Sequence, residues 1–153
     1  PVRVASSVLR SGWDHDAGAE GVSEVCAREA YEESGLGPKD LSLVELHDAS
    51  APAEIMACES LGLCPKGGGG PLVASGATKL GGRIPVSTSG GLLRKGHPIG
   101  ATGIAQIVEI AEQIQGRSGA RQVAGAKVGL CHNGGGNIGT DAAAQCVTIL
   151  AAG

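Results

Sequence analysis

The sequence predicts an α/β fold with a mixed five-stranded sheet covered by helices. Segments rich in β-branched residues alternate along the chain with segments of helical periodicity. The 153 residues are 42% hydrophobic, which is enough apolar surface for one real core. There are 27 glycines, so the backbone turns often or packs closely. We expect residues 1–153 to form a single domain.

The first part of the chain is expected to hold two strands and two helices. Residues 1–10 contain several valines and predict a strand. Residues 21–34 place apolar side chains at helical spacing among charged ones, and Gly35 ends that helix. A short apolar strand is expected at 41–46, followed by a second helix at 51–61.

The second part begins with a turn-rich excursion over residues 64–82 and continues with a strand at 84–88. Residues 100–115 give the clearest helical pattern of the chain. Strands at 127–131 and 142–150 complete the expected sheet, and these last two are expected to be adjacent and antiparallel. One face of the helix at 100–115 is apolar and the other polar: Ile104, Ile107, Val108, Ala111 and Ile114 against Gln106, Glu109, Glu112 and Gln113.

Composition argues against several classes of function. The net charge is −3 and no stripe of Lys and Arg is present, so nucleic acid is not expected as the main ligand. No apolar run reaches the roughly 18 residues of a membrane span. The five cysteines are odd in number and show no C-x-x-C spacing. This pattern favours reduced thiols and a cytoplasmic location.

Three polar segments follow predicted strands and carry the candidate chemistry. They are His47-Asp48, the glycine-rich loop 90–103 with His97 at its centre, and Cys131-His132-Asn133. Loops beyond the strand ends form the ligand crevice of α/β folds, so we expect these side chains to converge. Imidazoles beside a thiol suit proton transfer around a carbonyl, with hydrogen bonds to a developing oxyanion.

Each of these residues also has a simpler interpretation. The glycine-rich loop is compatible with a plain tight turn and a surface histidine, and Asp48 with a helix N-cap beside His47. His132 could face away from the cleft, because neighbouring strand residues point to opposite faces. A metal site built from the three histidines at 47, 97 and 132 with Cys131 is not expected, since no close pair has zinc-ligand spacing.

Taken together, the motifs resemble the C-terminal half of a thiolase. The motifs are His47-Asp48, then Lys95-Gly96-His97-Pro98-x-Gly100-Ala101-Thr102-Gly103, then Cys131-His132-Asn133-Gly134-Gly135-Gly136. The resemblance covers the whole chain and is strongest to the sterol-carrier and lipid-transfer thiolases. It implies one half of the thiolase fold, acting on acyl-coenzyme A with coenzyme A as a substrate and no separate cofactor.

The resemblance also implies roles for individual residues. His97 would activate a nucleophilic cysteine and help to hold a thioester oxygen, and His47 would share that oxyanion site. Cys131 would move the proton at the α-carbon. Substrate contacts are expected from residues beside these three: Asp48, Gly96, His132, Asn133 and Gly134.

Two departures from the family pattern matter. The loop that reads His-Asp-Cys-Phe in sterol-carrier thiolases reads His47-Asp48-Ala49-Ser50 here, and the glycine of the Cys-x-Gly pattern falls one place late, at Gly134. The half of the fold that carries the nucleophile is also missing from this chain. We therefore expect an N-terminal half or partner subunit and a homo- or hetero-oligomer. The alternative is a non-catalytic scaffold or a module that binds lipid or acyl-CoA.

Overall fold

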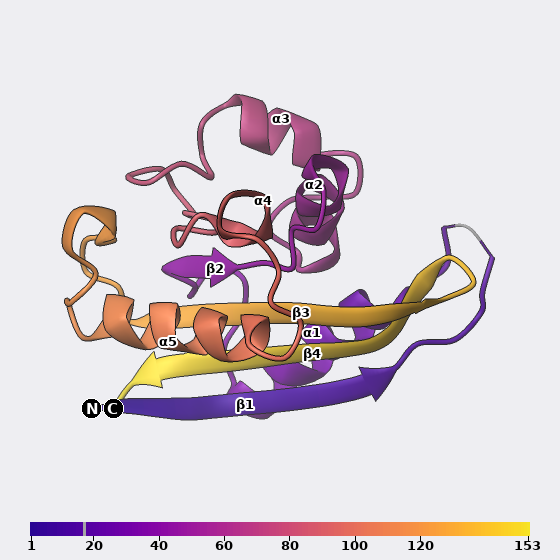
Figure 1. Ribbon diagram of the computed structural model, residues 1–153, viewed down its shortest axis with the longest axis horizontal. Helices are drawn as coiled ribbons and strands as arrows, with labels where there is room; N and C mark the ends of the chain where they lie inside the picture. The colour runs from indigo at the N-terminus through magenta and orange to yellow at the C-terminus, as the bar shows by residue number, and fades with distance from the viewer. Residues whose placement is uncertain (17) are drawn as a thin grey trace.

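The computed structural model describes residues 1–16 and 18–153 and shows a mixed four-stranded sheet with helices on both faces (Figure 1). The strand order is β1-β4-β3-β2. The β1/β4 and β4/β3 pairs are antiparallel, and the β3/β2 pair is parallel. The α/β class and the mixed sheet are therefore confirmed. The strands span Val2–Ser11 (β1), Leu43–Glu45 (β2), Val128–Ile138 (β3) and Asp141–Ala152 (β4).

Two longer helices cover opposite faces of the sheet. Helix α1 packs against β1 and β4, whereas α5 packs mainly against β3, and three shorter helices lie beyond the β2 edge (Figure 1). Gly35 ends α1 in the left-handed conformation, as its position in the sequence predicts. In the described part of the chain, no helix has the length and apolar character needed to cross a membrane. The helices span Val22–Ser34 (α1), Ala51–Ser60 (α2), Gly69–Ala74 (α3), Gly91–Lys95 (α4) and Thr102–Ile114 (α5), with a 3-10 turn at Gly119–Arg121.

The fifth strand expected at 84–88 is wrong. This segment makes only an isolated parallel bridge, between Val44 and Val86. Pro85 has no N–H to donate to a ladder. Ser87 then turns the chain out of extended geometry with φ 49°. The segment therefore touches the edge of β2 and leaves it at once, towards α4.

The loop expected after residue 131 is also wrong, because β3 continues to Ile138 and forms a hairpin with β4. Only Gly139 and Thr140 separate the two strands, and Gly139 has the positive φ that such a tight turn requires. The consequence for the site is direct. Cys131, His132 and Asn133 are strand residues, so their side chains alternate between the two faces of the sheet.

Helix α5 exposes part of its apolar stripe. Ile107, Ala111 and Ile114 pack against the core, whereas Ile104 and Val108 do not. Ile104 is 63% exposed and Val108 is 49% exposed, whereas Gln106, Glu109 and Gln113 are buried. The buried side chains are hydrogen-bonded: Gln106 donates to the carbonyl of His132, and Glu109 binds Arg121. A surface helix normally turns its apolar face inward. The exposed stripe, formed by Ile104 and Val108, is therefore a surface with the character of an interface.

Candidate functional site

The two histidines predicted from separate loops meet in space. His47 follows β2 and His97 precedes α5, and their ring centroids are 4.8 Å apart in an edge-to-face arrangement at 84°. His97 is exposed and His47 is half-buried. The fold thus brings together two imidazoles that are 50 positions apart in the chain.

Each ring is fixed by a hydrogen bond at Nδ1. Thr102 donates its hydroxyl to the carbonyl of Pro98 at 3.3 Å, so its Oγ1 accepts from Nδ1–H of His97 at 2.8 Å. The Nδ1–H of His47 donates to Oδ1 of Asn133 at 2.7 Å. A neutral imidazole held this way has its lone pair on Nε2. Within the described residues, neither Nε2 has a hydrogen-bond partner, so both are available to a reacting group.

Thr102 is a site residue that the sequence interpretation did not single out. It belongs to the motif of residues 95–103, five positions after His97, and lies in the first turn of α5. Threonine at a helix start usually caps the helix, and only the structure shows that this hydroxyl orients the imidazole instead. The only hint in the sequence was that Thr102 follows His97 by five positions with Pro98 between them, which allows the chain to turn back on the histidine.

The alternation along β3 separates the three residues that the sequence placed in one loop. Asn133 reaches His47 and lies on the same face of the sheet as Cys131, whereas His132 points to the opposite face, towards α1. The simpler interpretation is that His132 faces away from the cleft, and His132 does lie on the opposite face of the sheet from Cys131 and Asn133. His132 nevertheless lines the same cavity as His47.

Cys131 is buried in the core under α5. It is 4% exposed and lies in a cluster with Leu43 and Ile110. Burial raises the pKa of its thiol above the ordinary value, so the thiol is protonated at neutral pH. Its side chain borders a small cavity of about 240 Å³, together with Asn133 and Gly103. The proton-transfer role expected for Cys131 stays a prediction.

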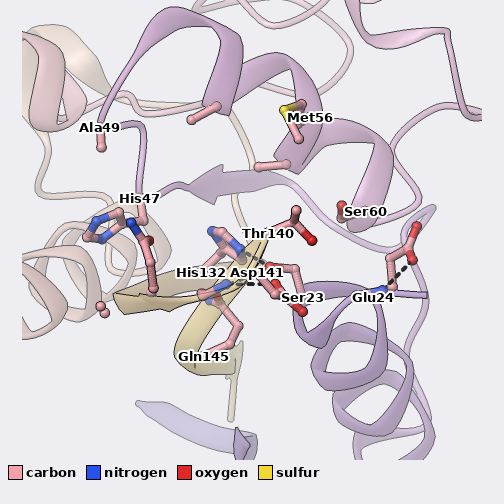
Figure 2. A pocket seen from close by; sticks show the side chains of 18 of the residues that line it. Ser23, Glu24, His47, Ala49, Met56, Ser60, His132, Thr140, Asp141 and Gln145 are labelled. Atoms are coloured by element: carbon pink, nitrogen blue, oxygen red, sulfur yellow. Dashed lines mark hydrogen bonds between the residues drawn. The ribbon is translucent and has the colours of Figure 1, made fainter. Parts of the chain in front are cut away.

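A larger cavity of about 590 Å³ opens beside His47 on the α1 side of the sheet (Figure 2). One wall is α2, and another is the glycine-rich end of the β3–β4 hairpin, including Gly134. This volume is in the range of cavities that bind small molecules. The residues that face it from the loop before α2 and from α2 itself are mostly small: Ala49, Ala53, Met56, Ala57 and Ser60.

His132 forms the polar floor of this cavity (Figure 2). It is 6% exposed, and burial lowers its pKa to about 4, so the ring is neutral at pH 7. Ser23 donates to Oε1 of Gln145, so the Nε2–H of His132 donates to the Ser23 hydroxyl at 3.0 Å. The Nδ1 atom of His132 is buried without a hydrogen-bond partner among the described residues.

Two residues expected to contact substrate are engaged within the protein. The buried carboxylate of Asp48 accepts a hydrogen bond from the backbone N–H of Leu92 at 2.7 Å. The N–H of Gly96 donates to the carbonyl of Leu92 and closes the end of α4. Both groups therefore hold the segment that leads to His97, and neither lines the large cavity.

Comparison with known proteins defines the family. The thiolase C-terminal domain-like family matches residues 14–151, so the chain belongs to the thiolase C-terminal domains. It is 52% identical to sterol carrier protein 2 of Rattus norvegicus over 112 residues, which is 73% of this chain and 20% of that protein. It is 49% identical over 116 residues to an acetyl-CoA acetyltransferase of Methanothermobacter thermautotrophicus, covering 76% of this chain and 30% of that protein.

A solved structure described as an Ltp2-ChsH2(DUF35) aldolase shares the fold with a TM-score of 0.83. The match covers 99% of this chain and 40% of that chain at 25% sequence identity. The resemblance to sterol-carrier and lipid-transfer thiolases is thus confirmed. The chain spans about a fifth to a third of the length of these two curated relatives.

Proposed function

We propose that this chain is the C-terminal catalytic half of a thiolase-like acyl-CoA acyltransferase whose nucleophilic cysteine lies in an N-terminal half. The reaction is formation or thiolytic cleavage of the carbon–carbon bond of a 3-ketoacyl-CoA. The observation that carries the proposal is the pair of histidines at 4.8 Å, each fixed at Nδ1 with its Nε2 available.

This geometry suits both steps of acyl transfer. The Nε2 of His97 can take the proton of a cysteine thiol, because Thr102 holds the ring in the required tautomer. An imidazolium formed this way donates from the same atom and can stabilise negative charge on a thioester oxygen. His47, oriented by Asn133, faces the same space, and its Nε2 supplies a second hydrogen bond when the ring is protonated.

The exposed stripe on α5 supports the missing half as the partner. Ile99 and Ile104 are largely exposed, and Val108 continues the stripe along the helix. An apolar surface of this kind on a small domain favours association with another chain or domain. Because the stripe begins next to His97 in the sequence, a half docked on α5 could bring its cysteine close to the imidazole pair.

The decisive experiment joins the two halves. The chain, linked to or coexpressed with the half that carries the nucleophile, should cleave a 3-ketoacyl-CoA in the presence of coenzyme A. His97→Ala should abolish this activity, because no third imidazole among the described residues lies against His47 to replace that of His97. Full activity in His97→Ala would refute the assignment.

Two observations favour a second candidate, a non-catalytic module that binds acyl-CoA or lipid. Ala49 stands where sterol-carrier thiolases have a cysteine, and Cys131 is buried with a raised pKa. Alkylation kinetics separate the two functions. A Cys131 thiol that reacts no faster than a free model thiol, even with the partner half bound, would favour the binding module.

A further inference from the structure

Two buried carboxylates stand on either side of His47 in the sequence, and both bind the segment that carries His97. Glu45 ends β2 and is 0% exposed, and Asp48 is 2% exposed. The segment they hold runs from residue 88 through α4 to His97. Neither carboxylate has a role in the chemistry proposed above.

Glu45 holds the beginning of the segment. Its Oε1 accepts from the backbone N–H of Ser89 at 3.0 Å. It also shares the hydroxyl of Thr88, which lies 3.2 Å from this oxygen and 3.2 Å from Oε1 of Glu109. The Oε2 of Glu45 accepts from the hydroxyl of Ser89 at 2.5 Å. The same hydroxyl receives a hydrogen bond from Nζ of Lys95 at 2.6 Å. Glu45 is therefore linked through one side chain to the last residue of α4, two positions before His97.

Asp48 holds the middle of the segment. Its Oδ1 accepts from the backbone N–H of Leu92 in the first turn of α4. Gly91 makes this approach possible, because a Cβ at that position would collide with the Asp48 carboxylate. Gly91 also has φ 61°, which other residues rarely adopt.

Burying two carboxylates is costly unless donors satisfy them, and apolar side chains would fill the same space more cheaply. Three donors bind Glu45 and Asp48 alone: the N–H and the hydroxyl of Ser89 and the N–H of Leu92. A fourth, the hydroxyl of Thr88, is shared with Glu109, and all four belong to residues 88–92. These hydrogen bonds join the segment to the residues on both sides of His47. The relative position of the two imidazole rings thus depends on these two carboxylates.

We propose that Glu45 and Asp48 are positioning residues that fix the segment 88–97 so that the His97 ring meets the His47 ring. The expected effect of this positioning on catalysis rests on the proposed function, whereas the expected effect on the distance between the two rings does not.

The test uses one disruptive and one conservative variant of Glu45. Glu45→Leu removes every acceptor, whereas Glu45→Gln keeps an oxygen for the Ser89 N–H. In the complex with the nucleophile-bearing half, Glu45→Leu should lower kcat ~10- to 100-fold with KM changed less than ~3-fold, because it misplaces the base rather than the substrate. Glu45→Gln should restore most of the rate.

A matched control separates positioning from stability. Glu59 accepts from the backbone N–H groups of Gly67 and Gly69, both at 2.9 Å, so it also holds a loop but one that does not carry His97. Glu59→Leu should lower stability and leave kcat unchanged. Equal losses of kcat in Glu45→Leu and Glu59→Leu would overturn the proposal.

A second readout needs no activity. Cross-relaxation between the ring protons of His47 and His97 in NMR spectra of the chain reports their contact directly. It should persist in Glu45→Gln and in the control, and be lost in Glu45→Leu and in Asp48→Ala. If Glu45→Leu does not fold, Ser89→Ala removes the hydroxyl that links Glu45 to Lys95 and to the N–H of Gly91, keeps the backbone bond to Glu45, and should weaken the same signal.

An unchanged signal in every folded variant would refute the positioning role. Absence of thiolysis in the wild-type complex, with the NMR result as expected, would instead refute the proposed function and leave the positioning role supported.

Discussion

Removing the hydroxyl of Thr102 should lower kcat of the proposed thiolysis by one to two orders of magnitude. Thr102→Val keeps the shape of this buried side chain and removes the acceptor for Nδ1–H of His97. When His97 takes a proton, that bond becomes a hydrogen bond from a charged donor, worth about 1.5–3 kcal/mol. Since each 1.36 kcal/mol changes a rate tenfold, kcat should fall roughly 10- to 150-fold.

The assay is steady-state thiolysis by the complex of this chain with the nucleophile-bearing half, alongside urea unfolding of the same samples. Thr102→Ser is the matched control, because it keeps the hydroxyl and loses only a methyl group, and it should retain most of the wild-type rate. Thr102→Val also loses the bond to Pro98, so a loss of stability of about 1 kcal/mol is expected. Wild-type kcat in folded Thr102→Val would refute the reasoning that this hydroxyl orients the base.

Three further outcomes follow from the structure. The pKa of His132 is about 4 in the folded chain and 6.5 in the unfolded chain, so the unfolded chain binds more protons between these pH values. The free energy of unfolding should therefore fall by up to about 3 kcal/mol as the pH drops from 6.5 to 4. Urea titrations at each pH should show this slope in the wild type and a flatter one in His132→Gln. Gly91→Ala should lower the free energy of unfolding by about 1–3 kcal/mol, because its Cβ meets the Asp48 carboxylate; a neutral result would contradict that contact. Ile104→Asp should change the stability of the chain by less than about 0.5 kcal/mol and prevent association with the partner half in sedimentation or pull-down measurements; association at wild-type affinity would exclude α5 as the interface.

The local patterns in the sequence predict most of the helices and strands. Valine-rich segments, helical spacing and a terminating Gly35 predict β1, β2 and α1 close to their observed bounds. The short helix α4 escapes prediction, because its glycines resemble a loop and the Leu92 N–H in its first turn donates to Asp48, which is 44 positions away.

For the candidate site, the sequence by itself determined which residue types are present and the family pattern they form. His47, His97 and Asn133 stand in motifs that local reasoning and the thiolase resemblance both single out. Their convergence follows from the general rule that loops beyond the ends of strands meet at one edge of a sheet.

Only the tertiary structure decided which way each side chain points. The antiparallel pairing of β3 with β4 extends the strand through residue 138, and this alternation sends Cys131 into the core under α5 and His132 into the large cavity. Gln106 and Glu109 of α5 are buried because they find partners on β3 and at Arg121, which leaves Ile104 and Val108 on the outside. Pairing partners and long-range hydrogen bonds set these directions, and periodicity along a single segment contains no information about either.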